Sequence, residues 1–279
     1  MRRAAAGLLP RDGSDPSYDW QGTVPFEEMP HVLNPPKGYF YTCNNKIIDD
    51  DFPHDLGHIW MNGYRAARLK ELLDSQETHS LEDFKDWQLD FYSVPGMAFA
   101  AWTKACQTLP AFQALPKRTQ KMAQYLMDWD GFLTADSLGG AIYQQLKMEL
   151  GRLVFAPHAA VRGQVTHPNL EFYRLSEFFG YDVPALLRLR HEPSSGWWVR
   201  SPDETLVQAL SYTERRLRER LGANMRKWNW GRLHPFIAKH TLGTSPLLRG
   251  FWDVGPYAGG GDTDTRCQQS QIPLEEDDD

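Results

Sequence analysis

The sequence predicts a mainly helical α+β protein, in which a few short strands accompany a helical body that spans about residues 55–221. Within that range, apolar residues recur at spacings of three and four, the period of an amphipathic helix. Strand-favouring residues are confined to a short run at 39–43 and to the stretch 228–260. With 41% hydrophobic and 24% charged residues over 279 positions, the chain can bury a large core.

Residues 1–38 are punctuated by proline, glycine and acidic residues, which prevents long helices and predicts an ordered loop with turns. Apolar side chains such as Trp20, Phe26 and Val32 are expected to pin this loop down. The run at 39–43 then predicts a strand that ends at the pair Asn44-Asn45.

Helical periodicity predicts a series of helices after this strand. Their ranges are about 56–73, 80–92, 96–108, 117–128, 137–153, 169–179, 183–190 and 203–221. Ser80 is expected to cap the second helix, because acidic residues follow it in the first turn. The last helix is the most regular, and Gly222 is placed to end it. The acidic residues 266–279 predict a flexible tail.

The overall charge and the absence of certain patterns exclude several classes of protein. A net charge of -6 gives no electrostatic reason to expect nucleic acid as a partner. No apolar stretch is long enough for a membrane span, and the run before Pro10 is too short for a secretory signal. Three cysteines, Cys43, Cys106 and Cys267, form no metal-type pair, although one disulfide among them is left open.

Two polar patterns near residue 50 raise the question of a metal. The segment from His54 through Asp55 to His58 resembles a zinc peptidase motif with Asp in place of Glu, which requires both histidines on one helix face. Pro53, Gly57 and the lack of a third ligand favour two partly exposed histidines instead. The acidic run at 49–51 with Asp55 is compatible with calcium, but a solvated acidic loop is the simpler interpretation.

A set of short motifs is recognisable in chain order. It comprises Tyr18-Asp19-Trp20-Gln21-Gly22, Val24-Pro25-Phe26-Glu27-Glu28-Met29-Pro30, Asn34-Pro35-Pro36-Lys37-Gly38-Tyr39, Asn44-Asn45-Lys46, Gly63-Tyr64-Arg65-Ala66-Ala67-Arg68-Leu69, Trp129-Asp130-Gly131, Trp228-Asn229-Trp230-Gly231-Arg232-Leu233-His234 and Gly260-Gly261-Asp262. With these motifs the chain resembles the penicillin acylase family of N-terminal nucleophile hydrolases from about residue 7 to 265. The resemblance implies that residues 1–265 are a partial large-subunit domain of a four-layer α/β/β/α sandwich.

The resemblance also implies a chemistry, the hydrolysis of linear amide bonds such as those of β-lactam or homoserine lactone acyl derivatives. An N-terminal serine attacks the amide carbonyl, and its own α-amino group acts as the base, so no cofactor takes part in the reaction. Asn44 matches the oxyanion-hole asparagine of the family, and Arg65 matches its active-site arginine. Asp55 matches an aspartate that ligates a structural calcium in some members.

The chain departs from the family pattern at both ends. The nucleophile serine is missing, since Ser14 lies in a loop without a processing mark, and the later Pro-Gly-Gln-Ser-Gly loop is absent. We therefore expect an acyl-amide substrate, an isolated chain without activity, and the missing small subunit and nucleophile-bearing segment as partners. Family members are commonly periplasmic or secreted. The alternatives are a non-catalytic remnant or partner-binding fragment, and a zinc peptidase-like site at His54, Asp55 and His58.

Overall fold

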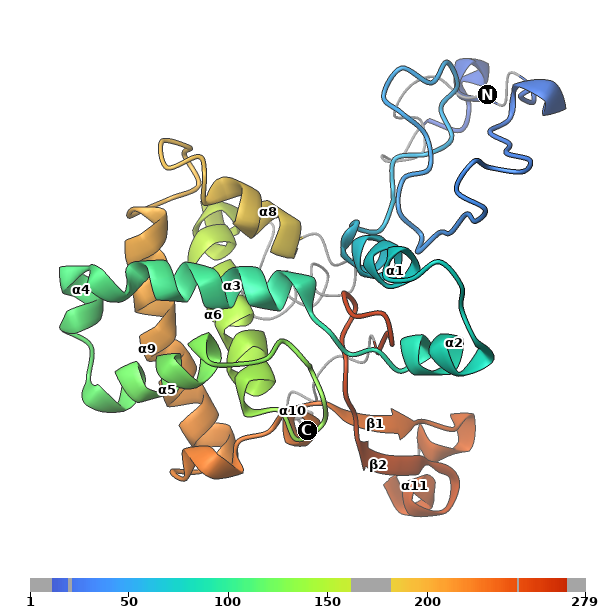
Figure 1. The fold of residues 1–279 in the computed structure, drawn as a ribbon. Helices are drawn as coiled ribbons and strands as arrows, with labels where there is room; N and C mark the ends of the chain where they lie inside the picture. Colours follow the sequence, from blue (N-terminus) through green and yellow to red (C-terminus); the bar gives the residue numbers. More distant parts are fainter. Residues whose placement is uncertain (1–11, 20–21, 162–181, 245, 270–279) are drawn as a thin grey trace.

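About half of the residues described by the computed structural model are helical, and the model describes residues 12–19, 22–161, 182–244 and 246–269 (Figure 1). A helical body contains α3 (Val94–Ala105), α4 (Pro110–Gln113), α5 (Lys117–Met127), α6 (Leu138–Val161), α8 (Asp182–Leu189), α9 (Pro202–Leu221) and α10 (Trp230–Leu233). Beside it lie α1 (Tyr64–Asp74), α2 (Leu81–Gln88) and a hairpin of β1 (Pro235–Ala238) and β2 (Val254–Ala258), whose connection contains α11 (Pro246–Trp252). The prediction of a mainly helical α+β protein is confirmed.

Helix α6 lies at the centre of the body and contacts α3, α5, α8 and α9. Its apolar residues meet those of its neighbours in one continuous core. The fully buried members include Phe99 and Trp102 from α3, Met122 and Leu126 from α5, Ile142, Tyr143, Leu146 and Leu150 from α6, and Leu206 and Leu210 from α9. Burial of large side chains at this density is the main favourable contribution to folding.

The two predicted helix ends, the N-cap Ser80 and the stop at Gly222, are present in the structure, and a further cap at Ser201 was not predicted. The Ser80 hydroxyl accepts a hydrogen bond from the Asp83 amide, and the Asp83 carboxylate accepts one from the Ser80 amide, which forms a capping box. Ser201 and Glu204 form the same arrangement at the start of α9. Helix α9 ends at Gly222, whose φ of 88° suits glycine.

Three predicted helices have clearly different bounds in the structure. Helix α2 ends at Gln88 rather than near residue 92. Helix α1 begins at Tyr64 rather than near residue 56, because the Met61 amide donates to the carbonyl of Asn44 instead of continuing a helix. Helix α6 extends through Pro157 to Val161, beyond the predicted end at 153. The predicted helix at 169–179 lies outside the described residues.

The prediction of a strand at residues 39–43 is wrong for the described part of the chain. No described strand lies alongside this segment, so its backbone has no ladder of hydrogen bonds to join. A single parallel bridge forms just after it, between Asn45 and Met61. The predicted strands between 228 and 260 are confirmed as β1 and β2, which pair antiparallel with Pro235 opposite Ala258.

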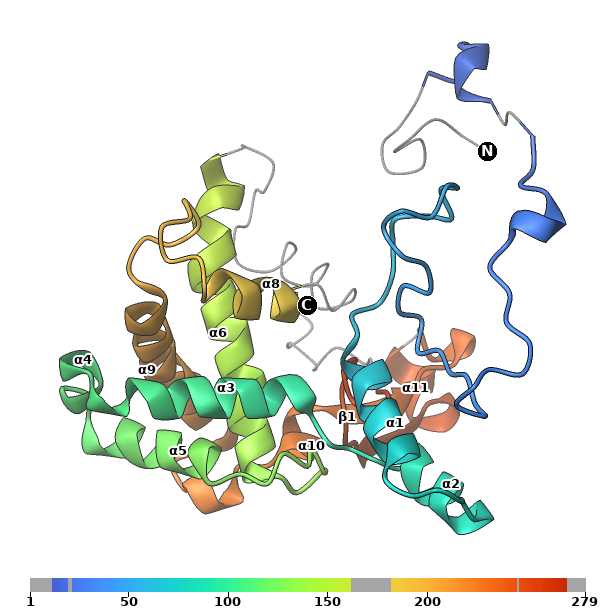
Figure 2. The same ribbon diagram turned by 45° about the horizontal axis from the view of Figure 1, so that its top comes forward.

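Residues 22–63, here called the N-terminal arm, extend away from the helical body in both views (Figures 1 and 2). The arm contains one short 3₁₀ helix, Phe26–Glu28, and is otherwise irregular. The expectation that Phe26 and Val32 pin it to the body is wrong, since they are 85% and 56% exposed. No helix within the described ranges is long and apolar enough to cross a membrane.

The contact between α6 and Trp129 yields a test of the core. A methyl group on Gly139 would lie 2.3 Å from Cγ of Trp129, whose indole is buried and stacked on Tyr143. We expect Gly139→Ala to lower the unfolding free energy by about 1–3 kcal/mol, because the steric clash exceeds the helix propensity that alanine adds.

The measurement is chemical denaturation monitored by far-UV circular dichroism. Gly250→Ala is the matched control, since Gly250 is also helical but has nothing within 4 Å of the added methyl. An equal loss of stability in both variants would contradict the packing described for α6.

Candidate active site

The structure brings Asn44 and Arg65 into direct contact, although 21 positions separate them in the sequence. The Arg65 guanidinium donates from Nη2 to Oδ1 of Asn44 at 2.9 Å and to the carbonyl of Cys43 at 2.8 Å. Arg65 is only 8% exposed, whereas Asn44 is exposed to solvent. The buried Arg65 guanidinium therefore fixes the exposed Asn44 side-chain amide from the protein side.

The contact fixes which end of the Asn44 amide faces outward. A guanidinium carries donors only, so the amide must turn its oxygen toward Arg65 and its NH2 group away. Among the described residues no acceptor binds that NH2 group. Asn44 has a φ of 63°, a left-handed conformation that asparagine tolerates better than most residues. The site thus presents an oriented hydrogen-bond donor at the surface.

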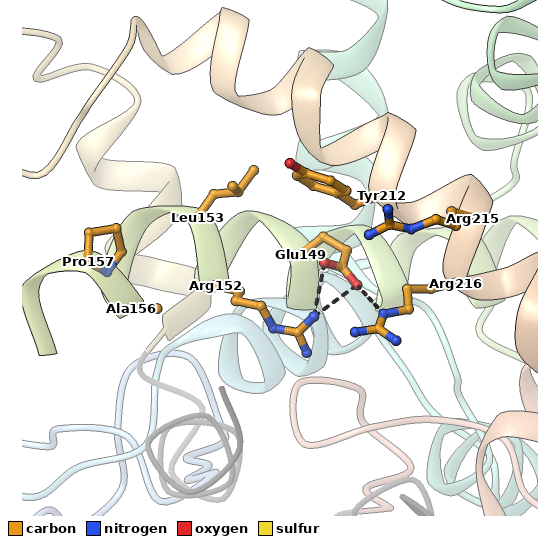
Figure 3. Close-up of a pocket in the computed structure, with 8 residues that line it drawn as sticks. All are labelled: Glu149, Arg152, Leu153, Ala156, Pro157, Tyr212, Arg215 and Arg216. Carbon is orange, nitrogen blue, oxygen red and sulfur yellow. Dashed lines mark hydrogen bonds and ion pairs between the residues drawn. The ribbon is translucent and has the colours of Figure 1, made fainter. Parts of the chain in front are cut away.

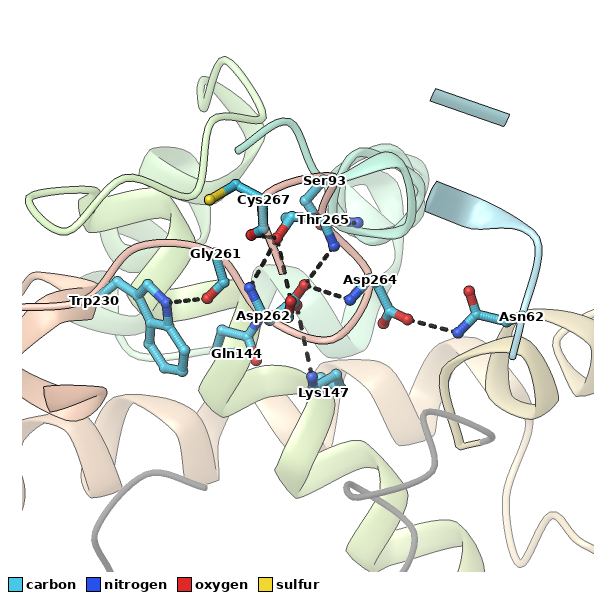
Figure 4. A network of polar contacts seen from close by, with 11 residues as sticks. Asn62, Ser93, Gln144, Lys147, Trp230, Gly261, Asp262, Asp264, Thr265 and Cys267 are labelled. Atoms are coloured by element: carbon cyan, nitrogen blue, oxygen red, sulfur yellow. Dashed lines mark hydrogen bonds and ion pairs between the residues drawn. The ribbon is translucent and has the colours of Figure 1, made fainter. Parts of the chain in front are cut away.

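Arg65 lies in the first turn of α1, and Asn62 holds the start of this helix. The Asn62 Oδ1 atom accepts from the Tyr64 amide at 3.2 Å, while Asn62 Nδ2 donates to Oδ1 of Asp264 at 2.6 Å (Figure 4). Asp264 belongs to the loop 261–265, which is 202 positions away from Asn62 in the numbering. The C-terminal Gly-Gly-Asp motif therefore lies beside the segment that carries Asn44 and Arg65.

The loop 261–265 is fixed by contacts on both of its sides. Asp262 Oδ1 accepts from the amides of Asp264 at 2.8 Å and Thr265 at 3.0 Å, which closes a tight turn. On the other side, Gln144 of α6 donates to Asp262 Oδ2, and the Lys147 Nζ atom lies 4.0 Å from the same oxygen. Gly261 permits this turn, since its φ is 73° and a side chain would collide with the carbonyl of Cys267.

Burial changes the acidity of the groups around this loop. Burial, followed by the charge of Asp262, raises the pKa of the Asp264 carboxyl to about 7, although Lys147 and the hydrogen bond from Asn62 act in the opposite direction. Burial also raises the pKa of Asp182. The Asp264 Oδ2 atom has no hydrogen-bond partner among the described residues, in agreement with a carboxyl that readily holds a proton.

A zinc peptidase motif requires His54 and His58 on one face of a helix. Residues 54–58 are not helical, so this requirement is not met. His54 Nε2 lies 2.6 Å from Oε2 of Glu28, whereas His58 Nε2 lies 3.0 Å from Oδ2 of Asp55. The two imidazoles therefore bind different carboxylates. Within the described ranges, no group of three or more His, Cys, Asp or Glu residues is arranged to hold a metal ion.

Asp55 does not form a calcium site with the described residues. Its Oδ1 atom accepts from the Gly57 amide at 2.9 Å, and its Oδ2 atom pairs with His58. Within the neighbouring acidic run, Asp50 pairs with Lys46. The described residues do not complete a coordination shell for calcium, and ligation by Asp55 stays a prediction.

Burial makes the thiols of Cys106 and Cys267 poor nucleophiles. All three cysteines are free, and Cys43 contributes its backbone carbonyl to Arg65. Burial raises the pKa of the Cys106 thiol to about 12 and also raises that of Cys267. Neither of these two thiols is therefore ionised near neutral pH.

Another candidate is a groove of about 470 Å3 between α6 and α9 (Figure 3). It is lined by Glu149, Arg152, Leu153, Ala156, Pro157, Tyr212, Arg215 and Arg216. The buried Glu149 pairs with Arg152 at 3.1 Å and lies 3.8 Å from Arg216. None of the residues singled out in the sequence lines this groove, and its arginines are paired with carboxylates, so we take the Asn44–Arg65 pair as the candidate site.

Asn62 and Asp264 are the members of the site that sequence reasoning missed. Both lie next to recognised motifs, Asn62 just before Gly63 and Asp264 two positions after Asp262. That adjacency is the signal that could have indicated them, but no local pattern predicts that the two side chains meet.

Comparisons with known proteins support the motifs. The sequence profile of the penicillin amidase family matches residues 1–274. The acyl-homoserine lactone acylase QuiP of Pseudomonas aeruginosa is 26% identical to this chain over 293 residues, covering 95% of this chain and 34% of that protein. The penicillin acylase 2 proenzyme of a Pseudomonas species is 28% identical, covering 96% of this chain and 33% of that protein. The chain thus spans about a third of the length of these curated relatives.

The raised pKa of Asp264 predicts a pH dependence of stability. The pKa of this carboxyl is 3.8 in its ordinary state and about 7 in the folded chain. Between these two pH values the folded state binds more protons than the unfolded state. The contribution of Asp264 to stability is therefore largest at low pH and is lost as the pH rises to about 7. We expect Asp264→Asn to remove this loss, so that its stability relative to the original chain increases across this range.

The measurement is a comparison of urea unfolding free energies of the two chains at several pH values. Asp136→Asn is the control, because Asp136 is an exposed carboxyl. A difference between the Asp264 variant and the original chain that stays constant with pH would contradict the assigned acidity.

Proposed function

Because the chain belongs to the penicillin amidase family, we propose that it takes part in hydrolysis of linear amide bonds, with Asn44 as an oxyanion donor and Arg65 as its support. The observation that carries this proposal is the hydrogen bond from Arg65 Nη2 to Asn44 Oδ1. It directs the amide NH2 group outward, where a substrate oxygen can approach it.

The proposed reaction is an acyl transfer to a serine in another segment of the acylase. The serine hydroxyl attacks the amide carbonyl and its α-amino group takes the proton, while the carbonyl electron pair moves onto oxygen. That oxygen gains negative charge only as the tetrahedral intermediate forms, so a fixed donor stabilises the transition state more than the substrate. Asn44 Nδ2 is the donor that this chain supplies.

Arg65 strengthens the donor in two ways. Its bond to Oδ1 holds the amide in place before the substrate arrives, which avoids a reorganisation cost during the reaction. A permanent positive charge behind the amide also favours negative charge on the far side of it. Lysine has the charge but not the planar set of donors that reaches both Asn44 and the carbonyl of Cys43.

Exposed apolar residues support a partner for this chain. Phe26 and Leu33 of the N-terminal arm are each 85% exposed, and Phe251 beside the hairpin is 84% exposed. The arm also carries Asn44, and the hairpin leads into the loop 261–265, so both exposed surfaces belong to segments that carry residues of the site. We propose that the nucleophile-bearing remainder of an acylase covers these surfaces and extends the hairpin into the sandwich of the family.

The substrate is proposed to be an N-acyl compound whose acyl chain is linked by an open amide. The similar proteins are named as acylases of acyl-homoserine lactones and of penicillins, and both names describe such a bond. In this proposal Asn44 contacts only the reacting carbonyl, and Arg65 contacts Asn44 and the carbonyl of Cys43, so neither residue selects the acyl chain.

The role of Asn44 predicts the effect of Asn44→Asp in an assembled acylase that contains this chain. Aspartate keeps the acceptor for Arg65 and tolerates the left-handed backbone, but it lacks the NH2 donor. We expect turnover of a chromogenic acyl anilide to fall by about 10²–10³-fold with little change in thermal stability.

Asn34→Asp serves as the matched control, because Asn34 is also an exposed asparagine with a positive φ, of 50°. It should leave turnover unchanged. Retention of full turnover by a folded Asn44→Asp enzyme would show that Asn44 is not the oxyanion donor.

A further prediction concerns the chain by itself. Asn44 and Arg65 stabilise charge only on an intermediate that a nucleophile creates, so the purified chain should not hydrolyse phenylacetyl or longer acyl anilides. Co-expression with nucleophile-bearing segments encoded beside it should yield an active complex. Failure of such segments to bind or to give turnover would favour the non-catalytic remnant, and metal-dependent turnover by the chain alone would favour the zinc alternative.

A further inference from the structure

We propose that Asp264 is a positioning residue for the Asn44–Arg65 pair and acts through its hydrogen bond with Asn62. The proposal rests on the proposed function for its effect on turnover, but the positioning itself concerns only the geometry of this chain. The bond joins the start of α1 to the loop 261–265, two parts of the molecule that are far apart in the sequence (Figure 4).

Asn62 lies between the backbone that bonds to Asn44 and the helix turn that carries Arg65. On its N-terminal side, the amide of Met61 donates to the carbonyl of Asn44 at 2.8 Å. On its C-terminal side, its own Oδ1 atom accepts from the Tyr64 amide, one residue before Arg65. A displacement of Asn62 therefore moves both the backbone that pairs with Asn44 and the helix turn that carries Arg65.

Asp264 provides a rigid anchor for Asn62. It is 1% exposed, and the turn that contains it is closed by the side chain of Asp262. Gln144 of the central helix α6 donates to that same side chain. A continuous series of contacts thus leads from the core through Asp262 and Asp264 to Asn62.

The charged groups around Asp264 come from several elements. Asp262 lies on the same loop, Lys147 on α6 and Asp182 at the start of α8, and the phenol of Tyr64 on α1 also interacts with the Asp264 charge. Asn62 supplies the hydrogen bond to Asp264 Oδ1. An ionised Asp264 is therefore partly compensated by this bond, which makes the bond strongest above the pKa of the carboxyl.

The test is hydrogen–deuterium exchange of the full chain at about pH 8, where Asp264 is ionised. The amides followed are those of Met61 and Ala67, which donate to Asn44 and Gly63, and amides of α9 serve as the internal reference. The variants are Asp264→Ala, Asp264→Asn, Asn62→Asp and the double variant Asn62→Asp with Asp264→Asn.

We expect Asp264→Ala and Asn62→Asp to speed exchange at Met61 and Ala67 by roughly three- to tenfold while α9 is unchanged, as loss of one hydrogen bond implies. Asp264→Asn keeps the acceptor oxygen and should retain protection. The double variant exchanges donor and acceptor, so it should restore protection that Asn62→Asp alone loses.

Unchanged exchange at Met61 and Ala67 in Asn62→Asp, or no recovery in the double variant, would overturn the positioning role even if Asp264→Ala failed to fold. Turnover of the assembled acylase separates this outcome from failure of the proposed function. If Asn62→Asp loses amide protection but Asn44→Asp keeps full turnover, the positioning role of Asp264 stands. The catalytic assignment of Asn44 is then wrong.

Discussion

Burial of residues 139–151 of α6 on all sides is the constraint on which both the core and the candidate site depend. Its apolar residues, such as Ile142 and Leu146, fill the space between α3, α5 and α9. Because the helix is enclosed, its polar residues are buried as well, and Gln144 and Lys147 must find partners inside the protein. Both are directed to Asp262, so the helix that forms the core also fixes the loop beside the site.

Three buried carboxylates near one buried lysine would be costly without compensation. The structure offsets this cost in different ways. Asp262 accepts two backbone hydrogen bonds and one from Gln144, whereas within the described ranges Asp264 accepts a side-chain hydrogen bond only from Asn62. Burial and the charge of Asp262 raise the pKa of the Asp264 carboxyl, and the hydrogen bond from Asn62 does not offset them. Asp264 is also the carboxyl that contacts Asn62, beside the segment of Asn44 and Arg65.

Local chemistry explains why much of the fold could be predicted from the sequence. Ser80 and Ser201 begin helices because a side-chain oxygen satisfies free amides in the first turn, and Gly222 ends α9 because it adopts a positive φ without strain. The resemblance of short motifs indicated Asn44 and Arg65, and the structure places them in contact. The helix ends depend only on residues adjacent in the chain, and the resemblance depends only on the order of the short motifs along it.

The sequence by itself predicted the helical body, the helix ends at Ser80 and Gly222, the hairpin region and, through the family resemblance, the candidate residues Asn44 and Arg65. Only the tertiary structure decided that residues 39–43 form no strand, because a strand needs a partner that local propensity cannot supply. It also decided that Asn62 meets Asp264, since burial around α6 brings distant segments together. Hydrogen bonding and burial between such segments depend on the whole fold, and no local pattern encodes them.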